Sequence, residues 1–232
     1  IAIMPLLIMA TMVKYGWRGF IKSGLLSGAI VLLAYWPFFP QNPLTGLILL
    51  AQKMGVSYSY TSLFAFNLWS YVGMWAQDST LLWGVPYYAW GASIMAVVFA
   101  ILFVKNRKRL AQPQSLYLLF ALSCYIFFLF PTRVHERYLF PMFAYLIAYV
   151  GMKRQIWLVA LLTLITVVYS LNLYLPYSYY EPLTNPLKNV LMEGWITRAV
   201  PTIAFIQLSI FVLLMFSEDI TKWWQRYFQL GK

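Results

Sequence analysis

The stretch 131-PTRVHERYLFP-141 holds the residues of this chain that are best suited to chemistry. Four ionisable side chains, including the only histidine of the chain, lie at Arg133, His135, Glu136 and Arg137. Two guanidinium groups near the start of a helix suit an anion such as phosphate. His135, Glu136 and Arg137 are consecutive, so on a helix they would point in three directions about 100° apart and could not all serve one contact. Arg133 and Arg137 are four residues apart and would share a face if the segment were helical.

A simpler interpretation of these charges stays open. Charged residues in a loop at a membrane surface need no ligand, and Glu136 could merely neutralise Arg133 or Arg137. A single histidine is more often structural than catalytic. The two arginines disfavour the cationic form of His135 while Glu136 favours it, so the sequence leaves the direction of its pKa shift undecided.

Other kinds of chemistry find little support in the sequence. One histidine and one cysteine cannot form a zinc site, so we expect no bound metal centre of that type. The chain has no GxSxG, Walker A or GxGxxG motif. A Ser-His-Asp triad would need Asp78, which no local signature supports.

Composition places these residues in a membrane protein. Of the 232 residues, 62% are hydrophobic, 19% aromatic and only 10% charged, whereas a soluble domain carries about a quarter charged residues. The mean hydropathy is +0.70. The net charge of +11 does not indicate nucleic-acid binding, because the basic residues lie between apolar segments. The single Cys124 excludes a disulfide framework.

The chain is expected to be an all-α, polytopic bundle of about six to seven membrane-spanning helices, since each span needs about 20 apolar residues. Residues 1–13 resemble the end of a membrane helix that begins upstream, so we expect the chain to be the C-terminal part of a longer protein. The predicted spans are 1–13 (partial), 23–39, 86–104, 114–131, 137–152, 156–175 and 198–216.

The positions of lysine and arginine predict the orientation. The basic connections 14–22, 105–110 and 153–154 and the tail 217–232 are expected on the cytoplasmic side. The outer side then holds 40–85, the charged loop 132–136 and the loop 176–197. Within 40–85 we expect an interfacial helix at about 43–54, followed by a helix or re-entrant pair at about 61–77. The tail is typical of an amphipathic interfacial helix.

Two blocks of sequence resemble one family. PTRVHERYLFP resembles the HERY(L/Y)(F/Y)P signature of bacterial membrane mannosyltransferase-like proteins, and 58-YSYTSLFAFNLWSYVG-73 resembles a second block of that family, which usually has Asn where this chain has Phe64. These proteins are related to the second mannosyltransferase of glycosylphosphatidylinositol assembly and belong to the GT-C class of glycosyltransferases. HERY also resembles the HEK element of the dolichyl-phosphate-glucose-dependent glucosyltransferases. The resemblance covers about 36–152.

The resemblance implies transfer of mannose or glucose from a polyprenyl- or dolichyl-phosphate donor to a lipid, glycan or protein acceptor on the non-cytoplasmic face, with or without a divalent cation. Arg137, Arg133 and His135 would bind the donor phosphate and Glu136 would orient them. Asn67 and Trp69 would line the sugar or acceptor pocket. The carboxylate that acts as catalytic base in this class would precede Ile1, so the catalytic residue is unknown within this chain.

The alternative is a non-catalytic integral membrane subunit or a transporter of a larger complex. The predicted spans carry almost no charge at mid-membrane, which argues against a transport path. Either hypothesis predicts an integral protein, of the bacterial cytoplasmic membrane, with a further chain or the missing N-terminal half as partner. A carboxylate in the first outer loop of the upstream sequence would separate the two.

Overall fold

The structure is a computed structural model that describes residues 2–180 and 195–228. Within those residues the chain is mostly helical, with eight α-helices and four two-residue strands. The helices are α1 (Met4–Tyr35), α2 (Pro43–Val56), α3 (Tyr87–Asn106), α4 (Pro113–Leu129), α5 (Phe140–Lys153), α6 (Ile156–Tyr180), α8 (Trp195–Met215) and α9 (Ser217–Phe228). The strands are β1 (Ser62–Leu63), β2 (Leu81–Leu82), β3 (Val85–Pro86) and β4 (Val134–His135), and 3-10 turns lie at Leu68–Tyr71, Arg107–Arg109 and Glu136–Leu139.

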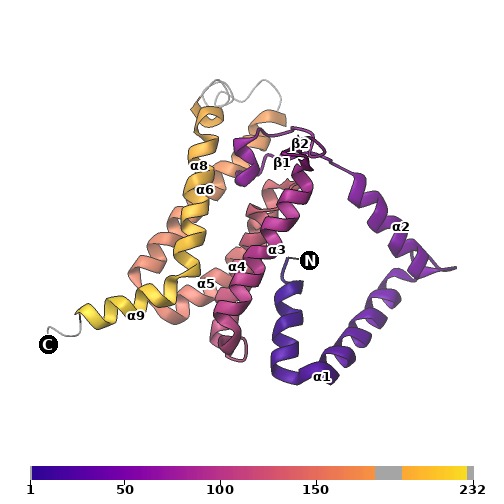
Figure 1. Ribbon diagram of the computed structural model, residues 1–232, viewed down its shortest axis with the longest axis horizontal. Coiled ribbons are helices and arrows are strands. Elements are labelled where there is room, and N and C mark those ends of the chain that lie inside the picture. The colour runs from indigo at the N-terminus through magenta and orange to yellow at the C-terminus, as the bar shows by residue number, and fades with distance from the viewer. Residues whose placement is uncertain (1, 181–194, 229–232) are drawn as a thin grey trace.

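Four helices are long and apolar enough to cross a membrane: α1, the α3 segment to Arg109, α6 over Ile156–Tyr177 and α8 over Arg198–Met215. Three of them fall on the predicted spans 86–104, 156–175 and 198–216. The predicted spans 1–13 and 23–39 join into α1, which bends sharply at Gly16 (Figure 1). Gly16 has φ 65° and ψ −171°, a conformation that glycine adopts without a steric cost.

Among the described residues, four helices reach this length and hydropathy, against the six to seven spans predicted. The predicted spans 114–131 and 137–152 correspond to α4 and α5, which have 17 and 14 residues and fall short of the usual length. Helix α4 ends at Leu129 and α5 begins only at Phe140, because the segment between them contains an extended strand and a 3-10 turn. The predicted loop 132–136 falls in this break, and the 3-10 turn Glu136–Leu139 makes α5 begin later than the predicted span 137–152.

Helix α4 forms the centre of the bundle. It packs most extensively on α5 and also contacts α1, α3 and α8, so its side chains are buried on nearly every face. Tyr125 of α4 lies edge-on to Phe211 of α8, with ring centroids 5.7 Å apart, and donates a hydrogen bond to the Gln207 carbonyl. Leu6 of α1 is buried in the same core.

The segment between α2 and α3 does not contain the helix or re-entrant pair expected over 61–77. It is irregular backbone around β1 and the turn Leu68–Tyr71, and it is buried from Thr61 to Asn67. The apolar residues from Thr61 to Asn67 therefore pack against the rest of the protein. Only α2, close to the helix predicted at 43–54, matches the expectation for this region.

The predicted grouping of the connections into two ends agrees with the arrangement in space. The bend of α1, the α3–α4 turn and α9 lie at the lower end in Figure 1, while β1, β2 and the end of α6 lie at the upper end. At the lower end Lys105 pairs with Asp219, and Glu218 pairs with Arg109 at 3.3 Å and Lys153 at 3.4 Å. These bonds join the basic connections to the start of α9. Which end faces the cytoplasm stays a prediction.

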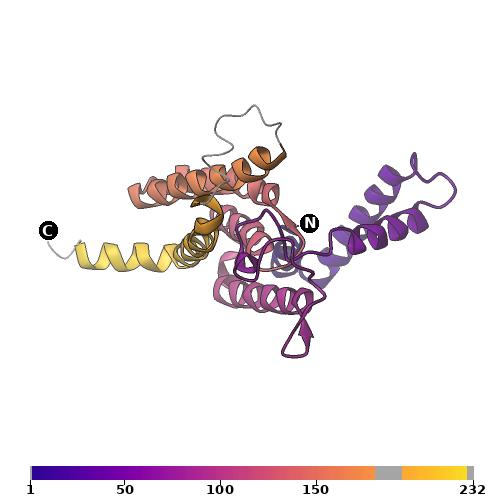
Figure 2. The same cartoon turned by 90° about the horizontal axis from the view of Figure 1, so that it is seen from above.

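Figure 2 shows the same bundle from above, with α1 and α2 extending to one side. The predicted tail 217–232 is helical over α9, and 229–232 lie outside the described residues. The predicted loop 176–197 is helical at both described flanks, in α6 up to Tyr180 and in α8 from Trp195. The rest of that loop, 181–194, lies outside the described residues.

Candidate functional site

The two blocks of sequence that carry the family resemblance meet in a two-stranded parallel sheet. Strand β1 pairs with β4 so that Ser62 lies opposite Val134 and Leu63 opposite His135. The backbone N–H of Arg133 donates to the carbonyl of Tyr60 at 3.0 Å. The chain therefore positions the HERY residues by laying them along the irregular segment that follows α2.

Arg133 forms a paired contact with Asp78, whose side chain is fully buried. The Arg133 Nε donates to one carboxylate oxygen at 2.5 Å, and its second nitrogen donates to the other at 3.2 Å. Thr132 Oγ1 donates to the same carboxylate at 3.1 Å, and Arg133 also donates to the Gly55 carbonyl. The hydrogen bonding of its guanidinium to the Asp78 carboxylate raises the pKa of Arg133. The side chain of Arg133 thus links three parts of the chain, namely α2, the segment that precedes β2, and β4.

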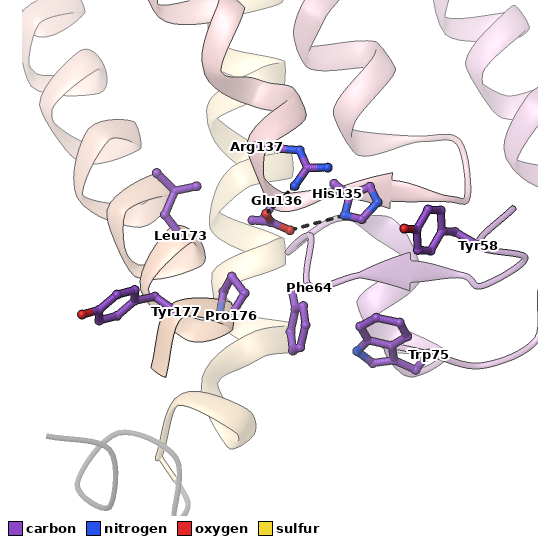
Figure 3. A pocket seen from close by; sticks show the side chains of 9 residues that line it. All are labelled: Tyr58, Phe64, Trp75, His135, Glu136, Arg137, Leu173, Pro176 and Tyr177. Carbon is purple, nitrogen blue, oxygen red and sulfur yellow. Dashed lines mark ion pairs between the residues drawn. The ribbon is translucent and has the colours of Figure 1, made fainter. Parts of the chain in front are cut away.

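A cleft of about 530 Å³ opens beside this sheet, and three predicted site residues line it. Its lining combines residues 58–75, the HERY motif and the upper part of α6: Tyr58, Phe64, Trp75, His135, Glu136, Arg137, Leu173, Pro176 and Tyr177 (Figure 3). The volume is in the range of small-molecule sites. Arg133 is not among the lining residues.

His135, Glu136 and Arg137 all reach this one cleft, contrary to the expectation for a helical segment. The backbone is extended at His135 and becomes a 3-10 turn from Glu136, so the three side chains do not follow helical spacing. Figure 3 shows Glu136 between the other two. Its carboxylate lies 3.7 Å from His135 Nδ1 and 3.9 Å from a guanidinium nitrogen of Arg137. The Arg137 side chain is 65% exposed, so it can accept an anion from solution.

The structure decides the direction of the His135 pKa shift. Burial lowers its pKa first and the charge of Arg137 lowers it further, while Glu136 acts in the opposite sense. The ring packs edge-on against Tyr58 and Tyr138, with centroids 5.2 and 5.4 Å away. At neutral pH His135 is therefore a neutral hydrogen-bonding group, and Arg137 is the cation of the cleft.

Three aromatic residues of the cleft have backbones in the left-handed region. Their φ angles are 57° at Tyr58, 62° at Phe64 and 65° at Trp75. Bulky residues rarely adopt this conformation, which costs on the order of 1 kcal/mol or more each, and such residues cluster at functional sites. Trp75 lies edge-on to Phe64 with centroids 5.1 Å apart. Tyr58, Phe64 and Trp75 together form an aromatic wall on one side of the cleft.

Asn67 and Trp69, predicted to line a sugar pocket, do not lie in the cleft. Both side chains are buried. Asn67 donates to the Phe128 carbonyl at 3.2 Å and accepts from the Trp69 N–H, while Trp69 Nε1 donates to the Phe130 carbonyl at 2.7 Å. They satisfy the free carbonyls at the end of α4 and so fasten the irregular segment to the bundle.

Sequence reasoning missed the whole aromatic wall and the whole α6 side of the cleft. Tyr58 and Phe64 lie in the block that carries the resemblance, so they could have been chosen from it. Leu173, Pro176 and Tyr177 have no signal of their own. Asn172 beside them is buried and bonds the Phe64 carbonyl and the Phe66 N–H, the latter at 3.0 Å, and a buried polar residue in an apolar helix is a usable signal.

Within the described residues no three His, Cys, Asp or Glu side chains group to hold a metal ion. Among the described residues that line the cleft, Glu136 is the one carboxylate. Comparison of the chain with protein-family models, with curated proteins and with solved structures finds no match. The function therefore has to be argued from the cleft itself.

Proposed function

We propose that the chain binds a polyprenyl- or dolichyl-phosphate-linked sugar and belongs to a GT-C type hexosyltransferase that transfers mannose or glucose on the non-cytoplasmic face. The observation that carries the proposal is the meeting of His135, Glu136 and Arg137 in one cleft with an aromatic wall. A single exposed guanidinium suits a phosphate, and aromatic faces suit the apolar faces of a sugar.

In this proposal Arg137 binds the donor phosphate. Transfer breaks the bond between the anomeric carbon and the phosphate oxygen and forms one to the acceptor hydroxyl oxygen. The departing lipid phosphate gains negative charge, which Arg137 stabilises. Neutral His135 donates a hydrogen bond to the phosphate or sugar, and Glu136 holds both side chains in position. Arg133 takes no part, since Asp78 occupies it.

The proton of the acceptor hydroxyl goes to a general base. The family resemblance implies that this base is a carboxylate outside residues 1–232. The lipid part of the donor would lie against α6, where Leu173 and Tyr177 border the cleft and are exposed. The acceptor is a lipid, glycan or protein hydroxyl.

Donor binding by the chain itself is the first test. A short-chain polyprenyl-phosphate mannose with a fluorescent label is titrated against the purified protein in detergent. Arg137→Gln should weaken binding by about tenfold or more, since hydrogen bonds to charged groups contribute about 1.5–3 kcal/mol. Arg198→Gln, an exposed arginine of α8 outside the cleft, should leave it unchanged. Equal affinity in the two variants would remove Arg137 from the donor site.

Transfer of labelled mannose or glucose is the second test, made with the natural full-length protein in membranes. Arg137→Ala and His135→Ala should lower the rate severely while the protein stays folded in the membrane. Donor binding without transfer to any acceptor would favour the non-catalytic membrane subunit. Absence of both binding and transfer would reject the glycosyltransferase proposal.

A further inference from the structure

A second cleft, also of about 530 Å³, lies at the other end of α3. Four basic residues in a row of five positions line it together with two apolar residues and one acid: Phe103, Val104, Lys105, Arg107, Lys108, Arg109 and Asp219. The 20 residues of α3 separate it from the His135 cleft, a helix length of about 30 Å. No residue lines both clefts.

The charges of this second cleft are only partly paired. Lys105 bonds Asp219 and lies over the Phe216 ring, 3.8 Å from its centroid, and Arg109 pairs with Glu218 at 3.3 Å. Arg107 and Lys108 are exposed, and neither forms an ion pair within the part of the chain that the structure describes.

The net field at the cleft is positive. The four cations exceed the carboxylates of Asp219 and Glu218 by two charges. The neighbouring cations lower the pKa of Asp219, Lys105 through its hydrogen bond most of all, so this carboxylate stays ionised and the pairs persist. The two exposed cations are thus available to an anion from outside.

An exposed apolar strip on α3 leads into the cleft. Val97, Ile101 and Val104 are four and three residues apart and so share one face of the helix, and all three side chains are exposed. Val104 also lines the cleft. Because α3 is one of the four helices that could cross a membrane, this strip would face acyl chains.

We propose that the second cleft binds the headgroup of an anionic phospholipid. Arg107 and Lys108 contact its phosphate, and one acyl chain lies along Val97, Ile101 and Val104. Basic pockets beside membrane helices are suited to such headgroups. The strip favours a lipid over free phosphate, which would use only the cations. The Lys105–Asp219 and Arg109–Glu218 pairs connect the site to α9.

The test uses the whole chain in nanodiscs of phosphatidylcholine with a varied fraction of phosphatidylglycerol. Lipid retained after gentle extraction is counted by native mass spectrometry. The unsubstituted chain should retain phosphatidylglycerol above its bulk fraction, and raised salt should reduce the excess. The double variant Arg107→Gln, Lys108→Gln should lose about 25-fold in this preference, since each basic residue near an anionic surface contributes about fivefold.

The matched control is Lys14→Gln, Arg18→Gln, which removes two exposed cations near the bend of α1. It should keep the preference. An equal loss in both double variants would overturn the proposal by showing a general effect of net charge. An unsubstituted chain that retains the two lipids in their bulk ratio would overturn it without any variant. Displacement of the lipid by millimolar inorganic phosphate would overturn the proposal by showing that the cleft is a site for free phosphate.

Discussion

The Arg133–Asp78 pair offers the sharpest test of how the site is held together, because the two partners differ in burial. Asp78 is fully buried and its carboxylate receives three side-chain hydrogen bonds, whereas the Arg133 side chain is 31% exposed. The same bonds connect the end of α2, the segment before β2 and β4. Loss of the pair should therefore loosen the chain that carries Tyr58 and Trp75.

The unequal burial gives unequal costs. Arg133→Ala leaves a buried carboxylate with Thr132 as its remaining side-chain donor, and removing one partner of a buried pair costs about 3–5 kcal/mol of unfolding free energy. Asp78→Ala leaves a guanidinium that water can reach, so its cost should be about 2 kcal/mol, the size of one charge-assisted hydrogen bond. In the double variant the losses should fall short of additive by about 1–3 kcal/mol.

The only cysteine of the chain supplies the assay. Cys124 is buried in α4, so a thiol-reactive fluorophore reports its exposure as the protein unfolds in denaturant. Arg198→Ala, which removes an exposed arginine at the same end, serves as control and should change stability by less than about 0.5 kcal/mol. A larger loss for Asp78→Ala than for Arg133→Ala would refute the desolvation argument. Losses under about 1 kcal/mol in both would show that the pair is solvated.

Three further predictions concern other parts of the molecule. The pKa of His135 is lowered in the folded chain, so below about pH 6.5 the unfolded state binds a proton that the folded state does not. The free energy of unfolding should therefore decrease as the pH is lowered from about 6.5 to the pKa of the folded state. His135→Asn should flatten that part of the profile of unfolding midpoint against pH. Glu218→Gln breaks the pairs with Arg109 and Lys153 and should raise hydrogen exchange at the start of α9, with a cost of about 1 kcal/mol because these pairs are partly exposed. Gly91→Leu should lower the unfolding midpoint by several degrees, since even a Cβ at this position would lie 3.0–3.2 Å from the backbone that leaves α4.

Hydropathy and charge predicted most of the long helices and the grouping of their connections at two ends of the bundle. They did not predict how the site is built. The lysines and arginines at 105–110 and 153–154 do lie at the same end of the bundle. Basic residues are excluded from the apolar interior, so they lie in the connections between helices. The segment 61–77 was misjudged as helix, since burial against α4 and contact with lipid both require apolar residues. The cleft placement of His135, Glu136 and Arg137 depends on a change from strand to 3-10 turn, which no periodicity in so short a run can indicate.

Irregular backbone at the end of a membrane bundle has to find hydrogen-bond partners that a helix would supply by itself. In this chain polar side chains supply them. Asn67 at the end of α4 and Asn172 from α6 bond backbone groups directly, and Asp78 holds the Arg133 guanidinium, which donates to the Gly55 carbonyl. The three residues lie outside the cleft, yet each fixes a segment that lines it. The predicted sugar-pocket role of Asn67 thus gives way to a supporting one, and the division of the two arginines follows from the same requirement. The Arg133 guanidinium is bonded to Asp78 and to the Gly55 carbonyl. Arg137, exposed beside Glu136, is the guanidinium that can bind a ligand.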